Sequence, residues 1–168
     1  MDRYAGLITN DFANGVGTCV SFWAQGCPHH CSDCQNPETW DFKGGEEVSI
    51  DDVKKQIKEL EYQEGVTFSG GDPMYQIEAF IELAKYVHEC NMNVWVYTGF
   101  TYEQLIKLSE KDSKYLDALK EIDVMVDGPF INDLKSFDVK FRGSSNQRII
   151  DVPRSLEKNK IILVEKYI

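Results

Sequence analysis

The chain of 168 residues is long enough to bury a hydrophobic core, and its 42% hydrophobic content favours a single globular domain over residues 1–168 rather than a disordered segment. Its net charge of −10 argues against nucleic acid as a partner, because binding to phosphates requires clustered Lys and Arg side chains. No apolar run approaches the roughly 20 residues of a membrane-spanning helix, and the first residues carry no targeting pattern, so we expect a cytoplasmic protein.

The first part of the chain predicts two strands that lead to a cysteine-rich loop. A short extended piece begins at Tyr4, the turn-rich segment Asn14–Gly17 follows, and the apolar run Thr18–Ala24 predicts a buried strand. Directly after this strand the chain carries three cysteines spaced C-x3-C-x2-C, namely Cys27, Cys31 and Cys34. Thiolates on one short loop can converge on a soft metal centre.

Three thiolates do not complete the four ligands of a structural zinc site or an ordinary cubane cluster. Either a histidine such as His29 or His30, or a distant cysteine, supplies the fourth ligand, or one metal stays open for a substrate. We expect the other two cysteines, Cys19 and Cys90, to be buried as small hydrophobic residues. The odd count of five cysteines argues against a disulfide scaffold.

The rest of the chain predicts alternating helices and strands. Ser49 caps a helix, and Thr101 with Gln104 forms the capping-box pattern of another. The periodicity and the turn residues predict the other elements: strands at Val66–Ser69, Asn93–Tyr97, Ile122–Val126, Arg148–Val152 and Lys160–Glu165, with helices at Gln76–Glu89 and around Tyr115–Leu119.

This alternation predicts an α/β fold with a mostly parallel sheet. A complete eight-stranded (βα) barrel takes about 250 residues, so we expect an incomplete barrel of about five to six mostly parallel strands. The unusual residues follow the ends of successive strands: Cys27, Gly70-Gly71-Asp72, Thr98-Gly99 and Asp127-Gly128. Ligands of parallel α/β folds bind at that edge, so these residues are predicted to converge there.

The segment Gly70-Gly71-Asp72-Pro73 directly follows a predicted strand. By itself it is a common turn former. At the ligand edge, its glycines would allow close backbone approach, and its carboxylate would suit an ammonium group.

Two resemblances follow from these motifs. The cysteine spacing resembles the cluster loop of radical S-adenosylmethionine enzymes, and the Gly-Gly-Asp segment resembles the motif that holds the amino group of S-adenosylmethionine in them. The whole chain, from Asn14 to Arg148, resembles the activating protein of anaerobic (class III) ribonucleoside-triphosphate reductase. That resemblance is carried by Cys34–Trp40, Val96–Phe100, Val126–Phe130 and the string Arg142-Gly-Ser-Ser-Asn-Gln147.

The resemblance implies that Cys27, Cys31 and Cys34 ligate three irons of a [4Fe-4S] cluster and that S-adenosylmethionine binds the fourth iron. It also implies a set of residues that hold the cofactor: Asp33, Cys34, Gln35, Gly70, Gly71, Asp72 and, at neighbouring strand ends, Thr98 and Asp127. Asp33 stands where many radical enzymes carry an aromatic residue beside the adenine.

The implied reaction is the reductive cleavage of S-adenosylmethionine to methionine and a 5′-deoxyadenosyl radical. That radical removes a hydrogen from the Cα of a glycine in the reductase and so leaves a glycyl radical. The implied partners are the large subunit of the anaerobic reductase and an external one-electron reductant such as a flavodoxin. No residue is expected to act as a general acid or base, and we expect His29 and His30 to have structural roles.

Three other interpretations stay open on the sequence. The chain could activate another glycyl radical enzyme such as pyruvate formate-lyase, act as a radical enzyme on a small molecule, or be a non-catalytic Cys3His zinc-binding adaptor. The resemblance ends near Asp151, and residues 151–168 form a C-terminal extension to which the sequence assigns no role.

Overall fold

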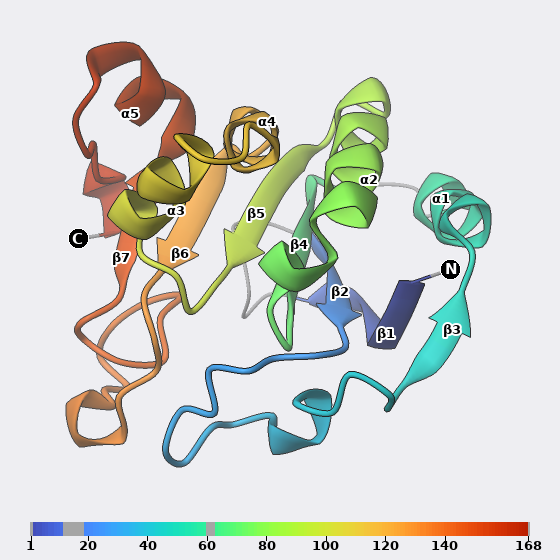
Figure 1. The fold of residues 1–168 in the computed structure, drawn as a ribbon, viewed down its shortest axis with the longest axis horizontal. Coiled ribbons are helices and arrows are strands. Elements are labelled where there is room, and N and C mark those ends of the chain that lie inside the picture. Colours follow the sequence, from blue (N-terminus) through green and yellow to red (C-terminus); the bar gives the residue numbers. More distant parts are fainter. Residues whose placement is uncertain (1, 12–18, 60–62, 168) are drawn as a thin grey trace.

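The computed structural model describes residues 2–11, 19–59 and 63–167 (Figure 1). Within them, seven strands form a sheet in the order β3-β1-β2-β4-β5-β6-β7. The strands are β1 (Asp2–Asp11), β2 (Cys19–Ala24), β3 (Glu46–Val48), β4 (Gly65–Gly70), β5 (Asn93–Tyr97), β6 (Val124–Asp127) and β7 (Arg148–Asp151). The predicted turn at 14–17 lies outside the described residues.

Four central strands, β2, β4, β5 and β6, pair in parallel. Strands β1 and β3 add an antiparallel edge on one side, and β7 pairs antiparallel with β6 on the other. The sheet has two different edge strands, β3 and β7, and is therefore an open, incomplete barrel, as the sequence predicts. It has seven strands rather than five or six, because the short segment after Gly45 pairs with the start of β1.

In the described residues, five α-helices accompany the sheet: α1 (Ile50–Glu59), α2 (Ile77–Glu89), α3 (Tyr102–Ser109), α4 (Lys114–Lys120) and α5 (Val152–Lys158). Helix α2 contacts α1 and α4, and α4 contacts α3 and α5, so the helices form one continuous layer (Figure 1). The main core lies between this layer and the parallel strands; Val20, Val66 and Val94 are fully buried in it. Buried β-branched residues of this kind are typical of parallel strands that are covered on both faces.

A smaller cluster covers the other side of the sheet. Trp95, Val126 and Ile149 are buried there. Phe141 and Tyr167 pack against Trp95, with ring centroids 5.6 and 6.2 Å from it. The C-terminal extension is therefore packed against the sheet.

The local signals at most helix starts are confirmed. Thr101 and Gln104 form the predicted capping box of α3, and the amide of Asp52 donates to Ser49 Oγ at 3.1 Å at the start of α1. The predicted strand at 160–165 is wrong: helix α5 follows β7, and this segment contributes a single bridge between Leu163 and Ile150. Asp151 ends β7 and starts this helix, because its carboxylate accepts from Arg154 N at 3.1 Å and Pro153 lies in the first turn.

The parallel arrangement brings the carboxyl ends of β2, β4, β5 and β6 to one edge of the sheet. Two long connections also lie at this edge, in the lower part of Figure 1. We call them the cysteine loop (residues 25–45) and the β6–β7 loop (residues 128–147). None of the helices in the described part of the chain has the length and apolar character that a bilayer crossing requires.

Candidate active site

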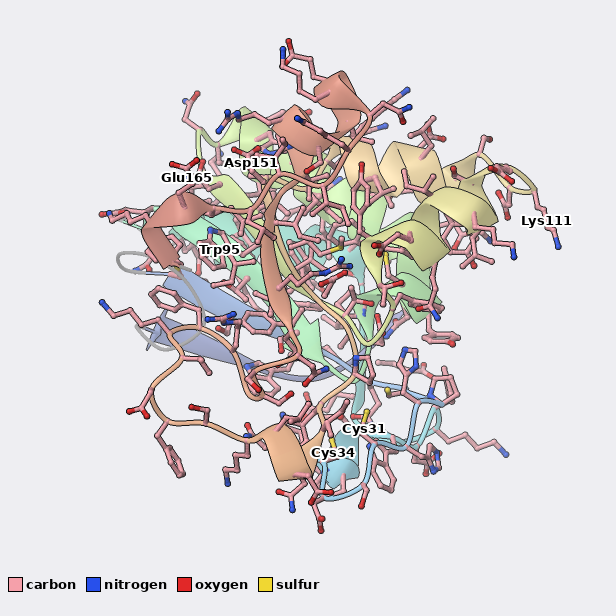
Figure 2. All side chains as sticks on the ribbon, turned by 90° about the vertical axis from the view of Figure 1, so that its left-hand side faces the viewer. Cys31, Cys34, Trp95, Lys111, Asp151 and Glu165 are labelled. Carbon is pink, nitrogen blue, oxygen red and sulfur yellow. The ribbon has the colours of Figure 1, made fainter. Side chains whose placement is uncertain are left out.

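A cavity of about 310 Å³ opens at the carboxyl edge of the parallel strands. The ends of β2, β4 and β5, the residue after β6, the cysteine loop and the β6–β7 loop all contribute to its lining. Cys27, Cys31 and Cys34 all line it, and Figure 2 shows Cys31 and Cys34 close together at this end of the molecule. The structure therefore brings the three predicted metal ligands to one cavity at the predicted edge.

The three thiols differ in their surroundings. Cys27 is 8% exposed, and burial raises the pKa of its thiol to about 11. Cys31 and Cys34 are half-buried, and Cys34 Sγ accepts a hydrogen bond from Asn36 N at 3.4 Å. Among the described residues, no group of three or more His, Cys, Asp or Glu side chains lies close enough together to hold a metal ion as it stands. The predicted burial of Cys19 is confirmed, since it is 1% exposed in β2.

The buried side chain of Gln25 holds the cysteine loop from within. Its amide nitrogen donates to the carbonyls of Glu38 at 3.0 Å and Asp41 at 2.7 Å. The main-chain carbonyl of Gln25 accepts from Gln76 Nε2 at 2.8 Å, which ties the loop to the segment before α2. Sequence reasoning missed this role, because a single Gln gives no signal of its tertiary partners.

The two histidines of the loop each have protein partners. His29 Nε2 lies 2.7 Å from Asp72 Oδ2, and its ring meets Phe100 edge-on with centroids 4.9 Å apart. His30 stacks on Trp40 with centroids 4.5 Å apart. The arrangement assigns both residues a structural role in the loop.

Asp72 is bound inside the protein and does not line the cavity. It is 1% exposed, and its carboxylate accepts from Thr98 Oγ1 at 2.9 and 3.0 Å, Gly99 N at 2.9 Å and Met74 N at 3.0 Å. Together with His29, these donors occupy both carboxylate oxygens. The sequence predicts that this carboxylate meets an ammonium group of the cofactor, whereas in the structure it joins the cysteine loop to β5.

The two glycines before Asp72 pack against the end of β2. Gly70 has a φ of +95°, and a Cβ there would lie 2.5 Å from Ala24 O. A Cβ on Gly71 would lie 2.5 Å from Gly26 O. The amides of Gly71 and Asp72 donate to Ala24 O and Gly26 O at 2.8 and 3.0 Å. Glycine is required here for close approach of two backbones, and these two amides are used within the protein.

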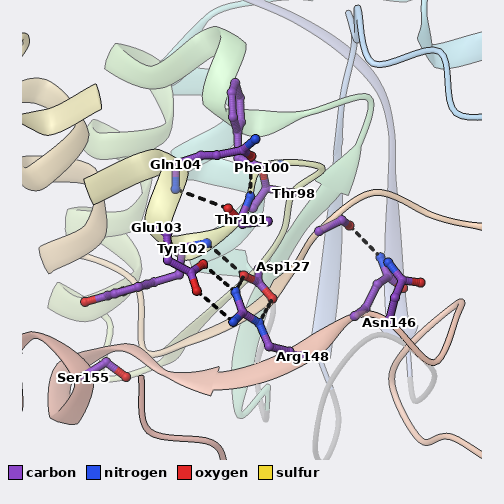
Figure 3. A network of polar contacts seen from close by, with 12 residues as sticks. Thr98, Phe100, Thr101, Tyr102, Glu103, Gln104, Asp127, Asn146, Arg148 and Ser155 are labelled. Atoms are coloured by element: carbon purple, nitrogen blue, oxygen red, sulfur yellow. Dashed lines mark hydrogen bonds and ion pairs between the residues drawn. The ribbon is translucent and has the colours of Figure 1, made fainter. Parts of the chain in front are cut away.

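The predicted cofactor residues divide into two groups. Cys34, Gln35, Gly70, Gly71 and Thr98 line the cavity. Asp33, Asp72 and Asp127 do not. Asp33 is exposed, with a φ of +56°. Asp127 is buried and accepts from Arg148 and from Tyr102 N, as Figure 3 shows.

The charge of the lining differs from that of the whole chain. Although the net charge is −10, no Asp or Glu is among the described residues that line the cavity, while Lys135 and Arg142 are. Arg142 Nε and Trp23 Nε1 are buried and have no hydrogen-bond partner among the described residues. Three thiols, two cations and two unsatisfied N–H donors fit an anionic thiolate-bound cluster and a ligand with acceptor oxygens. Sequence reasoning assigned no ligand role to Trp23, Lys135 or Arg142.

Comparisons with known proteins agree with this geometry. The chain matches the family described as a 4Fe-4S single cluster domain over residues 13–150. It is 33% identical over 153 residues to an anaerobic ribonucleoside-triphosphate reductase-activating protein from Salmonella typhimurium, which covers 86% of this chain and 96% of that protein. It is 35% identical over 159 residues to the protein of the same name from Haemophilus influenzae, covering 88% and 96%.

A solved structure, that of QueE from Escherichia coli, is similar in fold. The match has a TM-score of 0.50 at 18% identity and covers 60% of this chain and 53% of QueE. At this identity the likeness concerns the fold alone, and it agrees with the incomplete barrel. The identity over most of both sequences is decisive for the family: this chain belongs to the anaerobic ribonucleoside-triphosphate reductase-activating proteins and carries a 4Fe-4S single cluster domain.

Proposed function

We propose that the protein activates an anaerobic ribonucleoside-triphosphate reductase by generating a glycyl radical on it, with a [4Fe-4S] cluster and S-adenosylmethionine as cofactors. The observation that carries this proposal is the convergence of Cys27, Cys31 and Cys34 on one cavity at the carboxyl edge of the parallel strands. The names of the relatives support the choice of the reductase as the target.

Cys27, Cys31 and Cys34 would hold the cluster, and Gln35, Gly70, Gly71 and Thr98 would lie along S-adenosylmethionine. When bound, the cluster supplies one electron at low potential to the sulfonium of S-adenosylmethionine, and an external donor such as a flavodoxin replaces that electron. That electron would cleave S-adenosylmethionine to methionine and a 5′-deoxyadenosyl radical, which would take the hydrogen atom from the Cα of the partner glycine and leave as 5′-deoxyadenosine. The chain itself has to bind and orient these groups and to keep water out.

The remaining residues of the site have positioning roles in this proposal. Gln25 and the pair His29–Asp72 fix the cysteine loop. Trp23, Trp40 and Phe141 give the cavity an aromatic wall that excludes water. Trp23 and Arg142 also line the cavity, and their buried N–H groups have no hydrogen-bond partner among the described residues. Asp72 and Asp127 act through other protein groups rather than on the cofactor.

The test is an anaerobic reconstitution with iron and sulfide. We expect about four irons and four sulfides per chain. We also expect an EPR spectrum of the reduced protein that changes when S-adenosylmethionine is added. Mixing with purified anaerobic reductase, S-adenosylmethionine and a reductant should then give the EPR signal of a glycyl radical.

A matched pair of variants separates the site from the other thiols. Cys31→Ser should lose the cluster, whereas Cys90→Ser, at a half-buried cysteine packed against the core, should retain it. A protein that binds one zinc and no sulfide after reconstitution would refute the proposal and leave the zinc-binding adaptor. A loaded protein that gives no glycyl radical on the reductase would restrict the error to the choice of target.

A further inference from the structure

Three of the exposed apolar side chains lie on the β6–β7 loop, which also lines the cavity. In the described part of the chain, five large hydrophobic residues are exposed: Phe42, Tyr75, Ile131, Leu134 and Phe137. Phe42 belongs to the cysteine loop, Tyr75 follows β4, and the other three lie within the β6–β7 loop. Single exposed apolar residues are ordinary, but three of them on one loop beside the cavity indicate a surface that another molecule covers.

Phe137 is the extreme member of this group. Its side chain contributes to the lining of the cavity, yet the residue is 92% exposed. Its ring lies at the mouth and faces solvent, with Lys135 Nζ 5.2 Å from the ring centroid. Burial of so exposed a ring by a partner would remove a large apolar side chain from water and so favour binding.

The exposed segment is held in place by the string Arg142–Gln147. Ser145 N donates to Leu134 O at 2.8 Å, and Ile131 N donates to Ser144 Oγ at 3.2 Å. Ser144 is fully buried and forms an antiparallel bridge with Lys135. The segment that presents Ile131, Leu134 and Phe137 is therefore anchored at several points.

Gln147 fixes the string itself. Its Oε1 accepts from Gly143 N at 2.9 Å and from Ser144 N at 3.2 Å, and its Nε2 donates to Gly128 O at 3.0 Å. The string thus closes the β6–β7 loop onto the end of β6. Much of the string therefore holds the exposed residues Ile131, Leu134 and Phe137, which we call the apolar rim. The chemistry of the cofactors does not account for this role.

We propose that Ile131, Leu134 and Phe137 form the docking surface for the polypeptide segment of the reductase that carries the target glycine. This inference rests on the proposed function. The Cα of the target glycine can react in this cavity only if the reductase segment that carries it enters the cavity. A segment that enters beside the β6–β7 loop would pass the apolar rim. The absence of acidic groups from the described lining, with Lys135 and Arg142 present, suits an extended chain that presents carbonyl oxygens and acidic or apolar side chains.

The experiment compares Phe137→Ala and Leu134→Ala with Lys111→Ala. Lys111 is exposed and lies far from the cysteines in Figure 2, so it controls for truncation of a surface side chain. Each protein is loaded with cluster and mixed with increasing amounts of purified anaerobic reductase, and the glycyl radical is measured by EPR. Cleavage of S-adenosylmethionine by excess dithionite, without reductase, is measured in parallel.

We expect the Phe137 variant to need about tenfold more reductase for half of the maximal radical, as for an anchor residue of an interface. Leu134→Ala, at a residue that does not line the cavity, should also raise the amount of reductase needed. Its cleavage of S-adenosylmethionine without reductase and its melting temperature should equal those of the wild type and of Lys111→Ala. An unchanged reductase dependence in both rim variants would overturn the docking surface. So would a rim substitution whose sole effect is to dissociate a dimer of this chain in gel filtration, since the occupant is then a second copy. Failure of the wild type to form any glycyl radical would instead overturn the proposed function, and the docking surface with it.

Discussion

Nε2 of His29 lies 2.7 Å from Oδ2 of Asp72, and this contact joins the cysteine loop to the turn after β4. The same carboxylate accepts from Thr98 Oγ1 and Gly99 N at the end of β5. Gly99 leaves room for the imidazole, because a Cβ there would lie 2.6 Å from the His29 ring. One buried carboxylate therefore fixes the position of the loop that carries the thiols relative to two parallel strands.

Asp72→Asn tests this relationship. The amide has the size of the carboxylate but lacks its charge, so the hydrogen bonds from His29, Thr98 and Gly99 weaken. We expect a loss of about 2 kcal/mol in the free energy of unfolding, as for hydrogen bonds to a charged group, together with reduced iron loading. Urea denaturation of the apo protein and iron analysis after reconstitution measure the two effects.

Asp33→Asn is the matched control, because Asp33 lies on the same loop but is exposed. It should leave the unfolding midpoint unchanged. If Asp72→Asn keeps wild-type stability and iron content but binds S-adenosylmethionine more weakly, then Asp72 contacts the cofactor directly and its positioning role is wrong.

A second carboxylate network ties β6, β7 and α3 together. Arg148 donates to Glu103 at 2.7 and 3.0 Å and also binds the buried Asp127, as Figure 3 shows. The hydrogen bonds from the Arg148 guanidinium lower the pKa of Glu103 to about 2. Since the ordinary pKa of Glu is about 4.3, the contribution of Glu103 to stability is complete above that pH and is lost as the pH falls towards 2.

The substitution Glu103→Gln should therefore destabilise the protein at pH 7, and the difference from the wild type should shrink as the pH is lowered from about 4.5 towards 2.5. The expected effect at pH 7 is below about 1 kcal/mol, because the Glu103 side chain is 59% exposed and water screens the pair. Urea titrations at several pH values measure it. Glu110→Gln, at an exposed residue just after α3, serves as the control, and an equal pH trend in the two variants would contradict the assignment.

Local patterns were sufficient to predict most of the fold. The parallel strands carry continuous apolar runs, and the start of α3 carries a capping box whose two hydrogen bonds lie within four residues. The edge strand β3 was missed because it has three residues, two of them Glu, and depends on pairing with the distant β1. At the C-terminus, the apolar residues at 161–164 have the pattern of a strand. This segment follows α5, however, and contributes a single bridge, between Leu163 and Ile150.

The site shows the same division between local and tertiary information. The cysteine spacing and the position of the loop after β2 are local, so the thiols could be placed at the correct edge. The partners of Asp72 come from the cysteine loop and from the end of β5, 43 and 26 residues away in sequence. No sequence pattern shows which protein groups a carboxylate binds, and so the sequence predicts cofactor contacts for Asp72 and Asp127 but not the protein partners that the structure shows.

Far from the cavity, His88 on α2 bridges two carboxylates. Its Nε2 lies 2.8 Å from Asp123 Oδ2 and its Nδ1 lies 3.1 Å from Glu121 Oε2. Burial by itself would lower the pKa of His88, but the hydrogen bonds and charges of Asp123 and Glu121 outweigh it, and the pKa is raised. A raised pKa means that the stabilisation is complete below the unfolded value of about 6.5 and is lost as the pH rises through the folded pKa.

We therefore expect His88→Gln to lower the unfolding midpoint more at pH 5.5 than at pH 9. Chemical denaturation at the two pH values measures the difference. His30→Gln, at an exposed histidine stacked on Trp40, controls for a general effect of removing an imidazole. A midpoint loss that is the same at both pH values would show that His88 contributes packing rather than charge.

Gly70, at the end of β4, and Gly128, directly after β6, allow backbone strain to be distinguished from steric overlap. They have nearly the same φ, +95° and +94°, but a Cβ on Gly70 would lie 2.5 Å from Ala24 O, whereas the nearest atom to a Cβ on Gly128 is 3.9 Å away. Gly128→Ala should therefore lose about 1 kcal/mol through the left-handed backbone alone. Gly70→Ala should lose more, because β4 or the end of β2 has to move, and this shift displaces the cysteine loop that continues from β2. Thermal unfolding of both variants, with iron content after reconstitution, tests the difference: equal losses of stability and unchanged iron loading in both would mean that the contact between Gly70 and Ala24 does not position the loop.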